Sequence, residues 1–131
     1  MRLTLLVLTL AFAAVYGVAN SPATPSSNFE EICQELKFDC SQVRVPIIVI
    51  TQLVPPLYYG LYIRGEPYIF VNADNSLQQT LWTTYHETVH YVIENMRPGT
   101  DGCTSEEVAR KLTAWRFGLE YTEDWREVYG C

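Results

Sequence analysis

The stretch LWTTYHETVHYVIEN, residues 81–95, has the apolar period of a helix and carries two histidines one turn apart. Apolar and small side chains recur around it at spacings of three and four, which predicts a helix from about 77 to 96. Ser76 and Gln79 have the spacing of a capping box at its start, and Arg97-Pro98-Gly99 would end it. The expected core face is Leu77, Leu81, Tyr85, Thr88, Val92 and Met96.

A second stripe on a neighbouring face of this helix contains Trp82, His86, His90 and Ile93. His86 and His90 lie at i and i+4, so both imidazoles can reach one zinc ion. Glu87 lies about 100° around the helix, on the rim of the same cleft. It can accept a proton from a zinc-bound water without ligating the metal. Because the chain has only two histidines, this pattern predicts a catalytic zinc site with Glu87 as general base.

A catalytic zinc usually has three protein ligands, and no third histidine is present to complete the set. Met96 stands where the extended H-E-x-x-H-x-x-G-x-x-H motif has its last histidine, so that pattern is excluded. Glu94 shares the histidine face but points along the same helix, and we expect it to be solvated or to lie outside the ligand set. Glu106 and Glu107 open the next helix and are the natural source of the third ligand.

These two glutamates are adjacent, so a helix points them about 100° apart and only one can face the zinc. Ala109 lies at i+3 from Glu106, and a small residue there permits a close approach to the histidine helix. From Glu107 the corresponding residues are Arg110 and Lys111, which are expected to face solvent. We therefore predict Glu106 as the third ligand, with Glu107 as the alternative.

The remaining segments predict an α+β fold. A helix over 28–38 should precede three strands over 43–51, 57–64 and 67–72, which are dense in β-branched and aromatic residues. The second and third strands should form a hairpin around Gly65, giving a mostly antiparallel sheet. Ser27 or Asn28 would cap the first helix, with Glu30 or Glu31 completing a capping box. The apolar face of this helix would be Phe29, Ile32, Cys33 and Leu36. Pro46 would mark the first strand as an edge strand, or mark the start of that strand.

The last helix is expected to start with Thr104 or Ser105 as its cap. Its predicted core face is Val108, Leu112, Trp115 and Leu119. The tail residues expected to pack against the domain are Tyr121, Trp125 and Val128.

The N-terminus indicates export. Arg2 precedes an apolar run, and small residues at 17 and 19 predict a secretory signal peptide over 1–19, cleaved after Ala19. Residues 20–27 would form a short linker to a single domain over 28–131. No later segment could span a membrane, so we expect a secreted or extracytoplasmic monomer without stable membrane insertion. The 15 acidic and 9 scattered basic residues exclude a nucleic-acid partner.

All four cysteines lie after the predicted cleavage site, and an even count in a small exported chain predicts two disulfides. Four cysteines allow three pairings, of which we favour Cys33–Cys40 and Cys103–Cys131. A cysteine zinc site is the alternative, although no C-x-x-C spacing is present.

Residues 43–118 resemble the small gluzincins, especially the ImmA/IrrE-type metallopeptidase domain. In that family an E-x-x-A helix follows H-E-x-x-H, and its glutamate binds zinc; Glu106 and Ala109 match this spacing. The chain departs from the family at Val89, where a glycine is common. The resemblance implies a minimal zincin domain in which an edge strand, formed by residues 68–71 or 57–64, pairs with an extended peptide substrate.

Together these features predict an exported zinc-dependent endopeptidase. Two alternatives remain open: a non-catalytic binding module stapled by zinc, and a zinc amidase that acts on a non-protein amide such as that of peptidoglycan. Four protein ligands would mark the binding module.

Overall fold

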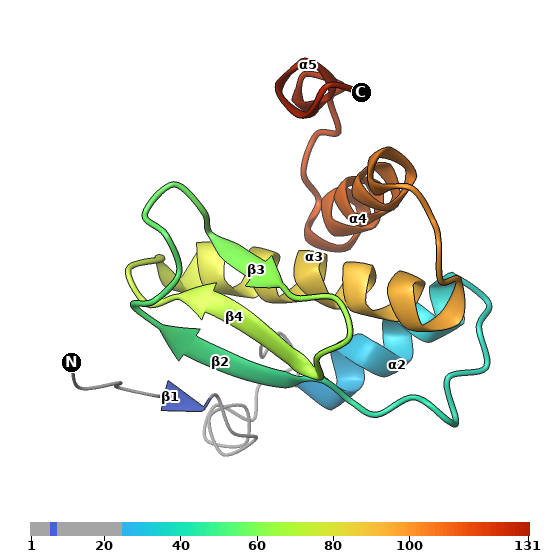
Figure 1. Ribbon diagram of the computed structural model, residues 1–131. Helices are drawn as coiled ribbons and strands as arrows, with labels where there is room; N and C mark the ends of the chain where they lie inside the picture. Colours follow the sequence, from blue (N-terminus) through green and yellow to red (C-terminus); the bar gives the residue numbers. More distant parts are fainter. Residues whose placement is uncertain (1–5, 8–24) are drawn as a thin grey trace.

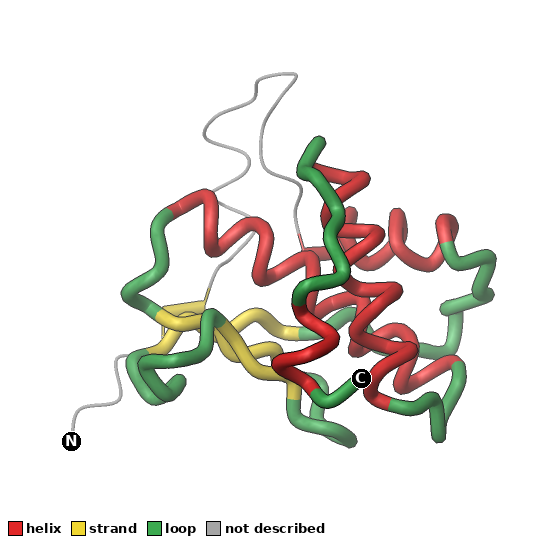
Figure 2. Tube along the Cα trace, turned by 90° about the horizontal axis from the view of Figure 1, so that it is seen from above, coloured by secondary structure: helices red, strands yellow, loops and turns green. Residues whose placement is uncertain are grey.

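The computed structural model describes residues 6–7 and 25–131, and it confirms the α+β class (Figure 1). Helix α3 (Leu77–Met96) is the central element and packs on strands β3 and β4, on α2 and on α4. Figure 2 shows the strands as one layer beside the helices. The other elements are β1 (Leu6–Val7), α2 (Pro25–Glu35), β2 (Ile47–Thr51), β3 (Gly60–Tyr62), β4 (Tyr68–Asn72), α4 (Gly102–Phe117) and α5 (Trp125–Tyr129).

The strand order in the described sheet is β1-β2-β4-β3. Strands β3 and β4 form the expected antiparallel hairpin, with Gly65 at a positive φ of 85° in its turn. Strands β2 and β4 pair in parallel, however, so the mostly antiparallel sheet predicted for these three strands is wrong at this pairing. Ile69 and Val71 are fully buried, and β4 therefore takes the centre of the sheet, with β3 turned back along its outer side.

The N-terminal predictions are tested only in part. The signal-peptide cleavage site and most of the linker lie outside the described residues. Strand β1 pairs antiparallel with β2 and falls within the segment expected to be removed, so cleavage would leave β2 as an edge strand. Helix α2 begins at Pro25, so the cap predicted at Ser27 or Asn28 is wrong and the last linker residues are helical.

The end of α2 is also earlier than predicted. The helix stops at Glu35 rather than at 38, because the chain turns through Lys37 at a positive φ of 58°. The Phe38 amide N–H donates to the Cys33 carbonyl oxygen at 2.9 Å and closes this turn. Strand β2 begins directly after Pro46, so the interpretation that this proline marks the start of the strand is confirmed.

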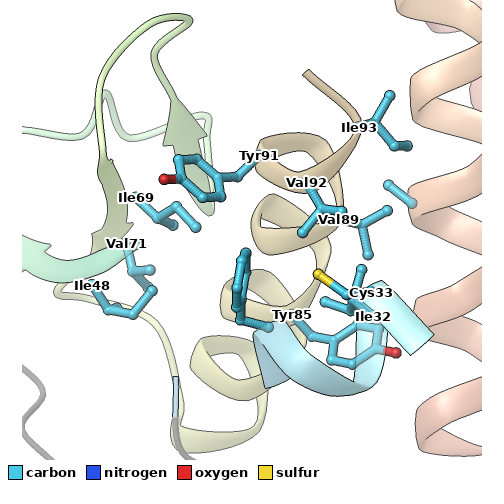
Figure 3. Close-up of a cluster of buried hydrophobic side chains, with 12 residues drawn as sticks. Ile32, Cys33, Ile48, Ile69, Val71, Tyr85, Val89, Tyr91, Val92 and Ile93 are labelled. Atoms are coloured by element: carbon cyan, nitrogen blue, oxygen red, sulfur yellow. The ribbon is translucent and has the colours of Figure 1, made fainter. Parts of the chain in front are cut away.

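The core lies between the sheet, α2 and α3 (Figure 3). The predicted core face of α3 is confirmed at Tyr85, Thr88 and Val92, which are all fully buried. It fails at Leu77, which is 61% exposed in the first turn of the helix. The capping box of Ser76 and Gln79 is confirmed. The fully buried partners from the other elements are Ile32 of α2, Ile48 of β2 and Ile69 and Val71 of β4.

Helix α4 differs most from its prediction. Asp101 caps it, accepting the Thr104 N–H at 2.8 Å, so the helix starts before the predicted caps Thr104 and Ser105. Val108 and Leu112 pack on the core, but Trp115 is 59% exposed. Leu119 lies beyond the helix and is also exposed, and in the tail Trp125 is buried whereas Val128 is 84% exposed. The buried side chains of α4 are Glu106, Ala109, Thr113 and Ala114.

The favoured disulfide pairing is confirmed. Cys33–Cys40 holds the turn after α2, and Cys103–Cys131 joins the first turn of α4 to the end of the chain. With all four cysteines bonded, the cysteine zinc site is excluded. The disulfides fit an extracellular protein. Among the described helices, none is long and apolar enough to cross a membrane.

Candidate metal centre

His86, His90 and Glu106 converge where α3 and α4 lie against each other. The two histidines are one turn apart on α3, and Glu106 comes from the first part of α4. His90 Nε2 lies 2.9 Å from Glu106 Oε2, and His86 Nε2 lies 3.2 Å from Glu106 Oε1. The two Nε2 atoms are 3.2 Å apart. The predicted convergence of these three side chains is therefore present in the fold.

The geometry of this group fits a metal ion. One ligand atom from each of the three residues lies within 4.8 Å of the others. Tetrahedral zinc, with bonds of about 2.0–2.2 Å, holds neighbouring ligand atoms about 3.3–3.6 Å apart. The separations of 2.9 and 3.2 Å are close to those values. Two imidazole nitrogens and a carboxylate can thus hold a divalent metal with little rearrangement.

The small residues of α4 explain how the helices approach each other. Ala109, one turn beyond Glu106, is fully buried. It lets α4 lie close to the histidine turn of α3, as the sequence argument required. Glu107 points away instead and pairs with Lys111 at 2.6 Å and with Arg126 at 3.1 Å. Of the two candidate glutamates, only Glu106 is next to the histidines.

Two polar neighbours of the group were missed in the sequence. Ser105 Oγ lies 2.7 Å from His90 Nδ1, so adjacent residues of α4 contact the two nitrogens of one imidazole ring. Arg110 Nε donates to Glu106 Oε1 at 2.7 Å. The i, i+4 spacing from Glu106 could have identified Arg110. Ser105 could have been found by asking which hydroxyl accepts the remaining N–H of His90.

Burial and hydrogen bonding act differently on the two carboxyl groups here. Burial raises the pKa of Glu87, and it outweighs the lowering effect of the nearby His86 and His90. Burial also acts to raise the pKa of Glu106, but hydrogen bonds to both histidines outweigh it and hold that pKa well below its usual range. Glu106 is therefore anionic, as a metal ligand must be, while Glu87 is a stronger base than an exposed carboxylate.

Glu87 lines a cleft of about 480 Å³ together with His86 and Glu106. Strand β3 forms one side of this cleft at Gly60. A Cβ at Gly60 would lie 2.5 Å from Thr83 Cγ2 and 2.8 Å from the Phe70 carbonyl oxygen. Only glycine therefore lets the strand rest against α3 at the turn that carries Glu87.

The sheet order decides between the two strands expected to meet a substrate. Residues 68–71 belong to β4, whose two edges are occupied by β2 and β3, so that alternative is wrong. Among the described strands, β3 is at the edge of the sheet, and it lies beside the cleft. Glu94 forms an ion pair with Arg64 at 3.0 Å, outside the three-residue group.

The comparisons with known proteins add no assignment. The chain matches no protein-family model, no curated protein and no solved structure.

Proposed function

We propose that this protein is an exported zinc-dependent endopeptidase. The observation that carries the proposal is the arrangement of four side chains. His86, His90 and Glu106 offer one ligand atom each within 4.8 Å, and Glu87 lines the same cleft without belonging to that group. Three protein ligands beside a carboxylate that lines the same cleft are the plan of a hydrolytic zinc site. The H-E-x-x-H and E-x-x-A spacings, which resemble those of small gluzincins, support the same function.

The donor set supports zinc over other metals. Imidazole nitrogen suits zinc, whereas magnesium and calcium prefer all-oxygen sites. His90 Nδ1 contacts Ser105 Oγ at 2.7 Å, and an N–H donated there leaves Nε2 as the metal-binding lone pair. His86 and Glu106 would complete the set. Bound zinc supplies a water of lowered pKa and polarises the carbonyl of the scissile bond.

The chain's own residues would carry the proton transfers. Glu87 takes a proton from the attacking water as the new carbon–oxygen bond forms, and then delivers it to the departing nitrogen as the carbon–nitrogen bond breaks. The raised pKa of Glu87, caused by burial, favours both steps because the same carboxyl must accept and then release the proton.

An extended peptide is the substrate that this site fits. Within the described sheet, strand β3 (residues 60–62) has an unpaired edge beside the cleft. Backbone N–H and C=O groups at such an edge can pair with an extended chain. On this strand Gly60 lies close to Glu87, since a Cβ added at Gly60 would be 3.6 Å from Glu87 Cγ. A peptide on the β3 edge would therefore pass next to the general base.

A zinc-stapled binding module is less well supported. A closed structural site needs four protein ligands. Within the described part of the chain, the metal-binding group contains three residues and all cysteines are in disulfides. A three-residue set would leave a fourth coordination position for water, as a hydrolytic site requires.

The decisive variant is Glu87→Gln. It should keep one zinc per molecule, measured by elemental analysis of the gel-filtered protein, because Glu87 is not in the ligand group. Its hydrolysis of casein and of generic peptides should fall at least about 100-fold, the scale of a lost general base.

Glu107→Gln is the matched control, since it changes the same chemical group in an exposed ion pair. Normal cleavage by Glu87→Gln would refute the role of Glu87. If the wild-type protein cleaved cell-wall fragments but no peptide, the amidase alternative would replace the endopeptidase.

A further inference from the structure

We infer that the cleft beside the metal centre is a subsite for one bulky apolar side chain of the peptide substrate, and that the C-terminal segment forms half of it. This inference rests on the proposed endopeptidase function. It assigns a role to the last part of the chain, which contributes nothing to the His–His–Glu group.

The cleft has two walls that are far apart in the sequence. Residues 57–59, from the loop between β2 and β3, and Gly60 at the start of β3 form the loop wall. Residues 119–122 and Tyr129, which follow α4, form the C-terminal wall. Thr113 and Ala114 of α4 also line the cleft, and both are small and buried. A side chain entering between the walls would lie next to His86 and Glu87.

Both walls expose apolar side chains to water. Leu57 is 94% exposed, Tyr59 is 61% exposed and Tyr129 is 56% exposed. Leu119, in the C-terminal wall, is also exposed. Nothing in the described part of the protein buries these groups, and apolar surface gathered at a concave site marks ligand binding. An apolar side chain of a substrate, bound between the walls, would remove this apolar surface from water.

The C-terminal wall is held to α4 by several contacts. The Cys103–Cys131 disulfide ties the end of the chain to the first turn of α4. The Arg110 guanidinium lies over the Tyr129 ring, 5.4 Å from its centroid, and its Nε donates to Glu106. The wall is thus connected directly to the metal centre. Such a preorganised wall loses little conformational entropy when a side chain binds.

The charges of the cleft argue against an acidic side chain. Glu87, Glu106 and Glu120 line it, while Arg110 is the cation among the lining residues. The Arg110 guanidinium is already engaged by Glu106 and by aromatic rings. Apart from the metal that His86, His90 and Glu106 would hold, a substrate glutamate would meet Glu87 and Glu120 without a free side-chain cation, whereas leucine or phenylalanine would meet apolar walls.

The test compares peptides that differ at one residue. Fluorogenic peptides with a common backbone would carry Phe, Leu, Ala, Lys or Glu on each side of the scissile bond in turn. With zinc-loaded wild-type protein, kcat/KM for Phe or Leu should exceed that for Ala by about tenfold to 100-fold, the range for burying a side chain of that size. Glu should give the lowest value. Equal rates, or a preference for Glu, would overturn the inference.

Variants locate the preference in the walls. Leu57→Ala and Leu119→Ala should each lower kcat/KM for the Phe peptide several-fold more than kcat/KM for the Ala peptide. Leu53→Ala and Val128→Ala are the controls, because both residues are exposed neighbours that do not line the cleft. They should change neither peptide. An equal loss for both peptides in the wall variants would show a structural effect and overturn the assignment.

Binding separates this inference from the proposed function. Fluorescence anisotropy would measure the affinity of the Phe and Glu peptides for the Glu87→Gln variant. A preference for Phe without any cleavage by the wild-type protein would retain the subsite and refute the peptidase. Cleavage of all peptides at one rate would retain the peptidase and refute the subsite. Absence of both binding and cleavage would refute both.

Discussion

Helices α3 and α4 lie against each other and both contribute to the His–His–Glu group, yet they bury different kinds of side chain. Helix α3 buries Tyr85, Val89 and Val92 completely. Helix α4 buries Glu106 and small residues such as Ala109, while its Trp115 stays 59% exposed. Apolar burial fixes α3 in the core, whereas small and polar burial lets α4 bring a carboxylate close to the histidines.

The contrast shows two ways in which a helix is held. Helix α3 is stabilised by removing large apolar surface from water. Helix α4 has less of that surface and relies on the Asp101 cap, the Cys103–Cys131 disulfide and ion pairs such as Glu107–Lys111. Truncation of the apolar face of α3 should therefore cost the most stability, whereas substitutions at Ser105 and Glu106 of α4 should act mainly on metal affinity.

The largest expected effect is on α3. Ile93→Ala should lower the free energy of unfolding by about 2–5 kcal/mol, because Ile93 is packed in the core and its truncation leaves a cavity. Urea denaturation followed by circular dichroism measures it. Leu77→Ala on the same helix is the control, since Leu77 is 61% exposed. An equal loss in both variants would contradict the burial of the α3 face.

The second-largest expected effect is on zinc affinity, and it distinguishes the adjacent residues Glu106 and Glu107 of α4. Glu106→Gln should weaken zinc binding at least about tenfold, because an anionic ligand becomes neutral. Glu107→Gln should leave zinc affinity nearly unchanged, since Glu107 pairs with Lys111 and Arg126. Competition with a chelating dye gives both affinities. The reverse order would make Glu107 the ligand and leave the enzyme class intact.

A smaller effect is expected at Ser105. Ser105→Ala should weaken zinc binding up to about tenfold, because the N–H of His90 loses the acceptor that orients the ring. Ser105→Thr, which keeps the hydroxyl, should restore the affinity. The unfolding midpoint of the metal-free protein should stay the same in both variants. A drop in that midpoint without a change in affinity would make Ser105 a structural residue only.

The smallest effect is expected at Trp115. Trp115→Ala should change the free energy of unfolding by no more than about 0.5 kcal/mol, as for other surface substitutions. A loss on the scale of a core tryptophan would mean that this face of α4 is covered in solution. Size-exclusion chromatography of the two proteins would then show whether a second copy covers it.

The sequence predicted α3 well because its local signals agree. The apolar period, the Ser76 cap and the stop near Pro98 all indicate one helix with the observed bounds. The meeting of Glu106 with the histidines also followed from helix geometry and from small Ala109. In these places the decisive information is local, or depends on a single close approach.

The failures have long-range causes. Asp101, Thr104 and Ser105 can all cap a helix, and only the path of the chain after α3 selects Asp101. The exposure of Trp115 depends on which face of α4 meets its neighbours. The parallel pairing of β2 with β4 joins the strands that precede and follow β3 in the sequence. Hydrophobic pattern alone does not specify such partners.

The two disulfides also act on the unfolded chain. They close loops with sequence separations of 7 and 28. Each such closure removes conformations from the unfolded ensemble and is worth about 2–4 kcal/mol. A domain this small has only about 5–15 kcal/mol of net stability to lose. The reduced, newly synthesised chain would therefore populate its folded form far less than the oxidised chain, so formation of these bonds would determine when the protein becomes folded.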